Sequence, residues 1–254
     1  SYHINLDSSN VRSLGKYPFG ANLCADMSPS ILAMGVGGGI RIYSWPSLSL
    51  LSEIKTNGVV MDVKIYNDHL FVANGLEGLL VYDISSPSSP SLVYWYDSPG
   101  YAKGIKIYGD RLYLSDGEFG VKIFDISSPS SPALIGSVST VGDATETDLY
   151  GNYLIVGEGS LGIEIFDISS VSSPVKVSDI TSIGDVRSVR VGGDRLFVAL
   201  GTNGLRVYDI SDPTSPTLVS SISTPYKFTG VELDGYLFVS AMMGGLRIID
   251  PSTA

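Results

Sequence analysis

The stretch GVKIFDISSPSSPALIG, from Gly120 to Gly136, decides the fold because the chain repeats it. Closely related stretches begin at Gly78, Gly162 and Gly204. Each begins with glycine, continues as an apolar run that ends in an aromatic residue and Asp, and passes into a turn rich in serine and proline. A sequence pattern that returns at a fixed spacing is typical of repeat architectures, in which each repeat is one small structural unit.

The period of the repeat is about 42 residues. The spacings between successive anchor glycines are 39, 42, 42, 42 and 41 residues. These anchors are Gly39, Gly78, Gly120, Gly162, Gly204 and Gly245. Six units account for nearly the whole chain, so we interpret residues 1–254 as a single domain.

Each unit reads as four short strands. In the third unit the predicted strands are 102–108, 111–115, 120–126 and 133–138, and Gly109-Asp110 is a tight hairpin turn between the first two. The third strand is apolar on both faces, which is typical of a strand buried between two layers. Four strands in about 42 residues, six times over, predict an all-β, six-bladed β-propeller of four-stranded antiparallel blades.

The Asp-Ile-Ser-Ser-Pro-Ser-Ser-Pro segment is predicted to be a turn. Its Asp ends the third strand, where a carboxylate can accept hydrogen bonds from backbone N–H groups two or three residues further on. Its last proline fixes φ just before the outer strand. Because the segment recurs in several units, we interpret it as a structural turn and not as a unique site.

The two ends of the chain predict how the ring closes. The last unit stops after three strands, and Val11–Tyr17 reads as an outer strand that precedes the first unit. We therefore expect this N-terminal strand to complete the last blade and close the ring. Tyr2–Asp7 is a further strand with two alternatives: a hairpin with Val11–Tyr17, or pairing with a neighbouring molecule.

Composition excludes several classes of function. The net charge of −10 argues against a nucleic-acid partner, and no apolar run is long enough for insertion into a membrane. One cysteine and two distant histidines give no disulfide, no metal site and no catalytic triad. We expect no cofactor. Few lysines and many serines, glycines and tyrosines favour an extracellular or cell-surface location.

The pattern apolar-Tyr/Phe-Asp-Ile-Ser-x-Pro-x-x-Pro-x-Leu-Val resembles the LVIVD repeat family. The stretches most similar to it are Leu79–Val93 and Leu205–Val219. The resemblance extends over all six units, although in the first Ser44-Trp45-Pro46-Ser47 replaces the Asp-Ile-Ser turn. It implies a propeller scaffold with an extracellular bias, and it supplies no catalytic residues.

Candidate ligand-binding residues lie at the mouth of the central channel, which the starts of the inner strands and the loops between second and third strands should form. The residue types at these positions differ between units, so the packing constraint that fixes the repeated core positions does not act on them. The candidates are Asp62, Lys103, Asp116, Glu146, Glu158 and Arg187. If the four acids converge, they can perform acid–base chemistry or bind a hard cation, unless the two cations neutralise them. The alternative is that all six are merely solvated.

Three aromatic residues, Tyr101, Phe119 and Tyr226, are expected on the same rim, where they would suit a sugar or a peptide. The sequence thus favours a non-catalytic extracellular or cell-surface module that binds a protein, peptide or glycan. One alternative is a hydrolase or lyase that uses the acids at the mouth. Another is a structural subunit that self-associates through Tyr2–Asp7.

Overall fold

The computed structural model describes residues 24–223, 225–242 and 245–250. These residues form six antiparallel sheets, of which five have four strands and the last has three. The first three sheets are β1 (Cys24–Met27), β2 (Ile31–Gly35), β3 (Gly39–Ser44) and β4 (Leu50–Lys55); β5 (Asp62–Tyr66), β6 (His69–Ala73), β7 (Leu79–Asp83) and β8 (Ser91–Tyr96); and β9 (Gly104–Tyr108), β10 (Arg111–Ser115), β11 (Val121–Asp125) and β12 (Ala133–Val138). The last three are β13 (Glu146–Tyr150), β14 (Tyr153–Gly157), β15 (Ile163–Asp167) and β16 (Val175–Ile180); β17 (Ser188–Gly192), β18 (Arg195–Ala199), β19 (Leu205–Asp209) and β20 (Thr217–Ile222); and β21 (Lys227–Asp234), β22 (Tyr236–Met242) and β23 (Gly245–Ile249).

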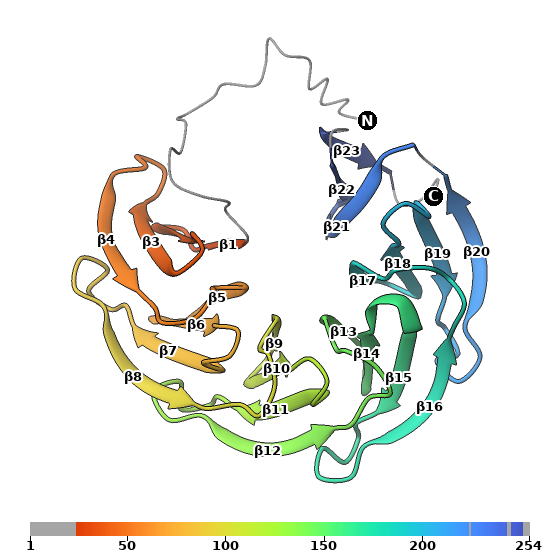
Figure 1. The fold of residues 1–254 in the computed structure, drawn as a ribbon, viewed down its shortest axis with the longest axis horizontal. Helices are drawn as coiled ribbons and strands as arrows, with labels where there is room; N and C mark the ends of the chain where they lie inside the picture. The colour runs from red at the N-terminus through yellow and green to blue at the C-terminus, as the bar shows by residue number, and fades with distance from the viewer. Residues whose placement is uncertain (1–23, 224, 243–244, 251–254) are drawn as a thin grey trace.

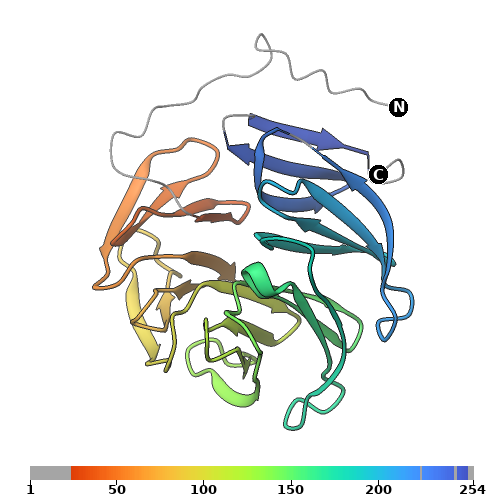
Figure 2. The same cartoon turned by 45° about the vertical axis from the view of Figure 1, so that its right-hand side comes forward.

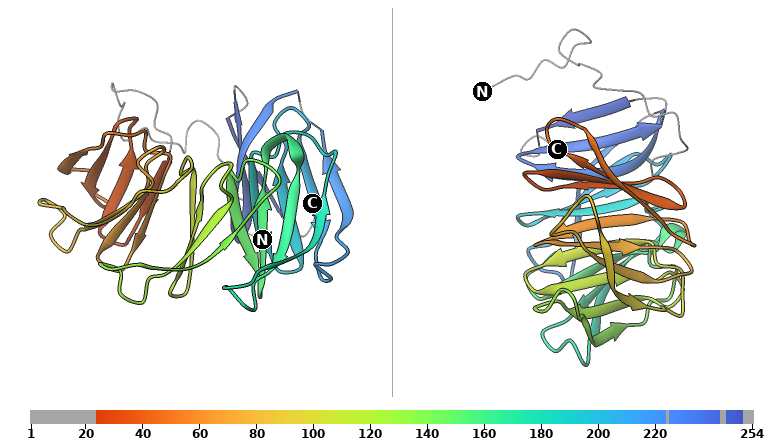
Figure 3. Two further views of the ribbon diagram at one scale, coloured as in Figure 1. Left: turned by 60° about the horizontal axis from the view of Figure 1, so that its bottom comes forward. Right: turned by 90° about the vertical axis from the view of Figure 1, so that its left-hand side faces the viewer.

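The sheets are arranged as blades around a common centre, in chain order (Figure 1). The first strand of each blade lies nearest the centre, and the fourth lies at the periphery. Seen from the side, the blades occupy one layer, so the molecule has two opposite faces (Figure 3, right). The chain is therefore an all-β, six-bladed propeller, as the repeat predicted.

The hairpin turns follow the predicted chemistry. In the third blade, Tyr108 pairs with Arg111 across a two-residue turn, and Gly109 adopts a φ of +56°. This left-handed conformation suits glycine because it has no Cβ to clash with the backbone. The turn predicted at Gly109-Asp110 is confirmed.

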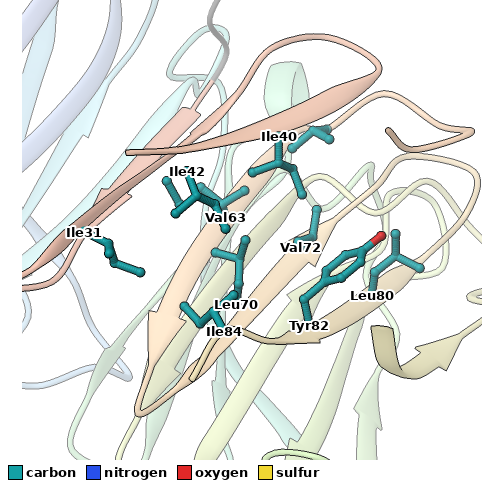
Figure 4. Close-up of a cluster of buried hydrophobic side chains, with 11 residues drawn as sticks. Ile31, Ile40, Ile42, Val63, Leu70, Val72, Leu80, Tyr82 and Ile84 are labelled. Carbon is teal, nitrogen blue, oxygen red and sulfur yellow. The ribbon is translucent and has the colours of Figure 1, made fainter. Parts of the chain in front are cut away.

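The hydrophobic core lies between successive blades. Val121, Ile123 and Phe124 of β11 are fully buried, so the third strand is covered on both faces as predicted. Between the first two blades, Ile42 of β3 belongs to the same buried cluster as Val63 of β5 (Figure 4). Burying one such side chain contributes roughly 1.5–3 kcal/mol, so each blade is stabilised mainly by its neighbours.

Two structural features explain why four of the six anchor positions hold glycine. Gly78, Gly120, Gly162 and Gly204 have φ values of +75°, +73°, +107° and +84°. A Cβ at Gly120 would also collide with the carbonyl oxygen of Val138 on the adjacent outer strand, and the other three meet the equivalent carbonyl. The third strand can therefore begin close beside the outer strand only when this position is glycine.

The serine- and proline-rich turn has the predicted hydrogen bonds. Asp125 Oδ1 accepts the N–H of Ser127 at 2.8 Å, and Asp83, Asp167 and Asp209 accept the N–H two residues on at 2.8–2.9 Å.

The turn also contacts the preceding blade, which the sequence did not indicate. Ser178 Oγ on β16 donates to the carbonyl of Pro213 in the next blade's turn at 2.6 Å, and Ser52 donates to Pro87 at 2.7 Å.

Acidic side chains connect the inner strands of neighbouring blades. Asp62 Oδ2 accepts the N–H of Ile105 in the next blade at 2.9 Å. Asp26 and Asp148 accept the N–H of Ile65 and Val191 at 2.7 and 2.9 Å. We call these three contacts the edge caps, because they satisfy N–H groups on the free edge of an inner strand.

The sixth blade packs beside the fifth through β17 and β21 (Figure 2). The strand Val11–Tyr17, predicted to complete this blade, and the strand Tyr2–Asp7 both lie outside the described residues, so closure of the ring stays a prediction. Among the residues that the structure describes, no helix has the length and apolar character needed to cross a membrane.

Candidate functional site at the channel mouth

The loops between the second and third strands of the blades form one face of the molecule. Each loop closes on itself, as where the Glu158 N–H donates to the Gly162 carbonyl at 2.8 Å. Its first glycine then holds the next blade: the Gly159 carbonyl accepts the N–H of Val186 at 2.8 Å. This bond positions Arg187 at the start of the following inner strand. The loop and inner-strand columns predicted for the mouth therefore do meet.

A pocket of about 620 Å³ opens on this face across the third, fourth and fifth blades. Three of the predicted residues, Lys103, Glu158 and Arg187, line it together. Two acids that sequence reasoning missed, Asp143 and Asp185, complete its charged lining. Both lie in the crossovers between blades, 42 residues apart, at a position outside the columns predicted for the mouth.

The charged groups of the mouth pocket are paired. The Lys103 ammonium forms a salt bridge with the Asp143 carboxylate. The Arg187 guanidinium does so with the Asp185 carboxylate. Within each pair the positive and the negative charge cancel. The pocket therefore offers hydrogen-bond donors and acceptors without a strong electrostatic potential of one sign.

Glu158 is the buried group of the mouth pocket. Its side chain is 3% exposed, and its Oε2 accepts the Gly142 N–H at 2.8 Å. Oε1 has no donor to accept from, because its neighbour is the Glu164 carboxylate. Burial, followed by the hydrogen bond and charge of Glu164, raises the pKa of Glu158 to about 8. At neutral pH Glu158 therefore holds a proton, which it can donate to Glu164.

Glu164 is the ionised member of this pair. Burial opposes its ionisation, but hydrogen bonds from Glu158 and Lys176 outweigh burial and lower the pKa of Glu164. The Lys176 Nζ lies 2.6 Å from Glu164 Oε1, and the Val141 N–H donates to Oε2 at 3.2 Å. Glu158 and Glu164 thus hold the crossover at residues 141 and 142, which continues into Asp143 of the pocket.

Asp116 occupies the same loop column as Glu158 but does not line the pocket. It is fully buried and accepts hydrogen bonds from Ser98 Oγ at 2.6 Å and the Gly100 N–H at 3.2 Å. Burial raises the pKa of its carboxyl group. Asp116, a candidate for the mouth, is therefore not exposed there, because the crossover from the second blade covers it.

Asp62 and Glu146 line the central channel. Asp62 forms an edge cap and lies 3.3 Å from the Lys64 ammonium. Glu146 forms a salt bridge with Arg190 at 2.5 Å. The two acid side chains are 20% and 24% exposed, and burial raises the pKa of both.

The four predicted acids therefore do not converge. They are divided between the channel wall, the mouth pocket and a buried crossover. Within residues 24–223, 225–242 and 245–250, no group of three or more histidine, cysteine or acidic side chains is arranged to hold a metal ion. A shared acid–base or cation site built from all four is not present in this part of the chain.

A ring of ionisable residues lies deeper in the channel, around a cavity of about 590 Å³. Its members, one from each inner strand, are Asp26, Lys64, Lys106, Asp148, Arg190 and Glu232, and all of them except Asp148 line the cavity. Lys106 pairs with Asp148 at 2.6 Å, and Arg190 with Glu232 at 2.9 Å. Sequence reasoning missed this ring. The signal was a charged residue two positions after the start of five of the six inner strands; in β21, Glu232 lies five positions after the start.

The three predicted rim aromatics lie outside the lining of the mouth pocket. Phe119 is 50% exposed, whereas Tyr101 is half-buried and its hydroxyl lies 3.7 Å from Met61 Sδ. The Tyr226 ring stacks 5.4 Å from the Arg247 guanidinium. Other exposed apolar side chains on this face are Leu76, Val141 and Leu161. The rim is thus more apolar than the three aromatics alone indicated.

Comparison with known proteins identifies the repeat. The family model described as LVIVD repeat matches residues 57–98, 99–140, 141–181 and 183–224. These segments contain the second to fifth blades in full and cover about two thirds of the chain. The first and last blades lie outside the matches, although we expected the resemblance to reach all six.

No curated protein sequence matches the chain. Among solved structures, the crystal structure of the computationally designed Ika8 protein superimposes with a TM-score of 0.70 at 12% sequence identity. The superposition covers 90% of this chain and 70% of that one. At this identity the likeness shows the fold alone.

Proposed function

The chain belongs to the LVIVD repeat family, and on that premise we propose that it is a non-catalytic interaction module which binds a protein, peptide or glycan at its channel mouth. The observation that carries this proposal is the mouth pocket of about 620 Å³, which lies within the range of sites for small molecules or side chains. Its lining residues vary between blades, whereas the core positions repeat.

The electrostatics of the pocket favour a polar ligand of low net charge. Lys103 and Arg187 are each paired with an acid, and Glu158 is protonated at neutral pH. A strongly anionic ligand would have to displace Asp143 and Asp185 from their partners. Exposed Leu161 adds an apolar contact at the edge of the same pocket.

The proposal is tested by probing a printed glycan array and a displayed peptide library with the full chain. The double variant Lys103→Ala/Arg187→Ala is expected to lose at least about tenfold in affinity for the ligand class that the wild type selects. Lys55→Ala, an exposed cation outside the pocket, is the matched control. A wild type that selects nothing, or a double variant that binds as the wild type does, contradicts the proposal.

A hydrolase or lyase is the second candidate, because Glu158 lines a pocket as a protonated carboxylic acid at neutral pH. A group in that state can act as a general acid. Incubation with a panel of p-nitrophenyl glycosides tests this directly. Turnover that Glu158→Gln abolishes while the fold is retained would favour the enzyme, whereas absence of turnover leaves the binding module preferred.

We also propose an extracellular or cell-surface location. The low lysine content and the single cysteine support it, as does the extracellular bias that the family resemblance implies. Fractionation of the native cells followed by immunodetection of the chain tests it. Recovery of the chain only from the cytosol would contradict the proposal.

A further inference from the structure

On the face opposite the mouth, tyrosine–aspartate hydrogen bonds join neighbouring blades. The Tyr66 hydroxyl, at the end of β5, donates to Asp110 in the next blade's hairpin turn at 2.6 Å. The Tyr150 hydroxyl, at the end of β13, donates in the same way to Asp194 at 2.7 Å. In each pair the aspartate follows the tyrosine by 44 residues.

This hydrogen bond is missing between the third and fourth blades. Tyr108 ends β9 as Tyr66 ends β5, but the residue 44 positions later is Asn152. Tyr108 is 65% exposed, and within the described part of the chain its hydroxyl has no hydrogen-bond partner. Three inner strands, β5, β9 and β13, end in tyrosine, and of these only β9 lacks the bond, because the acceptor position holds Asn152.

A pocket of about 410 Å³ lies where the missing bond would have been. Tyr108 and Asn152 line it from either side, and Arg111 and Asp125 add a cation and an anion. Ile168 contributes a buried apolar surface. The pocket thus combines an exposed aromatic ring, an amide and two opposite charges around an apolar floor.

Arg111 and Asp125 attract each other without forming an ion pair. Arg111 and Asp125 face each other across β10 and β11, as Arg195 and Asp209 do across β18 and β19. Arg195 and Asp209 form a salt bridge, whereas no ion pair joins Arg111 to Asp125 in the structure as described. The Arg111 guanidinium also bonds the Tyr113 hydroxyl, and Asp125 Oδ1 accepts the Ser127 N–H at 2.8 Å, so each group keeps part of its hydrogen-bonding capacity for a ligand, and their charges nearly cancel.

We propose that this pocket binds a neutral saccharide, with one sugar ring placed against Tyr108. A pyranose has an apolar face of C–H groups that packs on an aromatic ring, and a rim of hydroxyls that both donate and accept. Guanidinium, carboxylate and amide groups are planar and meet pairs of adjacent hydroxyls with two hydrogen bonds each. An anionic ligand would face Asp110 and Asp125, and a cationic one would face Arg111.

The test is titration of the ¹⁵N-labelled full chain with maltose, cellobiose, lactose and N,N′-diacetylchitobiose, followed by amide chemical shifts. At least one disaccharide is expected to shift residues 108–113 and 149–152 saturably, with a Kd of roughly 1 mM. Tyr108→Ala should weaken that binding at least about tenfold. Asn152→Asp should weaken it too, because it restores the acceptor that holds the tyrosine at the other two interfaces.

Two controls separate this site from others. Tyr150→Ala removes the equivalent tyrosine where the hydrogen bond is intact, and it should leave saccharide binding unchanged. Lys55→Ala alters an exposed cation outside both pockets and should also leave it unchanged, and the shifts are followed at residues 108–113 and 149–152, so the outcome is independent of the proposed function. The proposal is overturned if none of the four disaccharides binds saturably, or if neither Tyr108→Ala nor Asn152→Asp weakens binding.

Discussion

At Gly120 the absence of a side chain allows β11 to begin directly beside the outer strand β12. The residue has a φ of +73°, and a Cβ there would collide with the Val138 carbonyl. The sequence showed that this glycine recurs, but the recurrence alone did not distinguish a strained turn from a close approach of two strands. Both reasons apply at this position, and they can be separated by experiment.

Gly120→Ala is expected to lower the free energy of unfolding by at least about 3 kcal/mol, since strain and a steric clash add. Gly193→Ala is the matched control, because its φ is +57° and its Cβ would have nothing within 4 Å. That variant should cost only about 1 kcal/mol. Urea unfolding of both variants provides the measurement, and equal losses would show that the close approach is unimportant.

Glu158 makes the stability of the fold depend on pH. Its pKa is about 8 in the folded chain against an ordinary 4.5, so between these values the folded state holds a proton that the unfolded state has released. Stability therefore falls as pH rises through this window, by up to about 1.4 kcal/mol per pH unit. Below it, the contribution of Glu158 is fully present.

Glu158→Gln stays neutral at every pH and can donate its amide N–H to Glu164. Its free energy of unfolding should fall less steeply with rising pH than that of the wild type, so the variant gains relative stability toward pH 8. Unfolding curves recorded at several pH values across this window test the expectation. Parallel pH profiles for the two proteins would show that Glu158 ionises normally.

At the scale of the strand, the edge caps explain why acids occur on inner strands of an apolar repeat. Asp148 is 4% exposed, accepts the Val191 N–H at 2.9 Å and pairs with Lys106 at 2.6 Å. The inner strand needs these partners because its channel-side edge has no further strand beside it. The acids of the channel wall are thus part of the joint between blades.

Asp148→Ala should lower the free energy of unfolding by about 3–5 kcal/mol, because it leaves the half-buried Val191 N–H and the Lys106 ammonium without their partner. Glu118→Ala, an exposed acid on the mouth face, should change it by less than about 0.5 kcal/mol. Thermal or urea unfolding compares the two. Similar small effects for both substitutions would mean that the edge cap adds little.

Strand order and turn positions were predictable because glycine, aspartate and proline recur with the period of the blade. The role of the acids was less predictable. Asp116 and Glu158 share one loop column, and each is buried and accepts the N–H of a crossover glycine, Gly100 or Gly142, yet only Glu158 lines a pocket. The burial of these acids depends on the crossovers from the preceding blades, which the alignment of strands and turns does not place. Alignment of the repeat units alone does not show which segment of the neighbouring blade covers a given residue.

At the scale of the whole molecule, six blades were predictable from the period and the number of anchor glycines. The closure was predicted from the missing outer strand of the last blade. Among the described residues, β23 pairs with β22 and with no second strand. Val11–Tyr17 is the segment predicted to fill that edge, and it lies outside the described residues.

A chain that begins at residue 18 should therefore unfold at a lower urea concentration than the full chain, and a peptide of residues 11–17 added in trans should restore part of the loss. A second truncation that removes only residues 1–8 tests Tyr2–Asp7. If that strand pairs with a neighbouring molecule, sedimentation will show loss of self-association without loss of stability. Equal stability of all three chains would contradict closure by the N-terminal strand.

The edge caps all have the same polarity: the acceptor belongs to one blade and the donor to the blade that follows. Each blade thus has two different flanks that fit each other head to tail, which is the kind of interface that makes closed rings of separate subunits. Tandem duplication of one ancestral blade would supply both halves of this joint at once. The geometry therefore gives a direct evolutionary path from a ring of small identical chains to one fused chain.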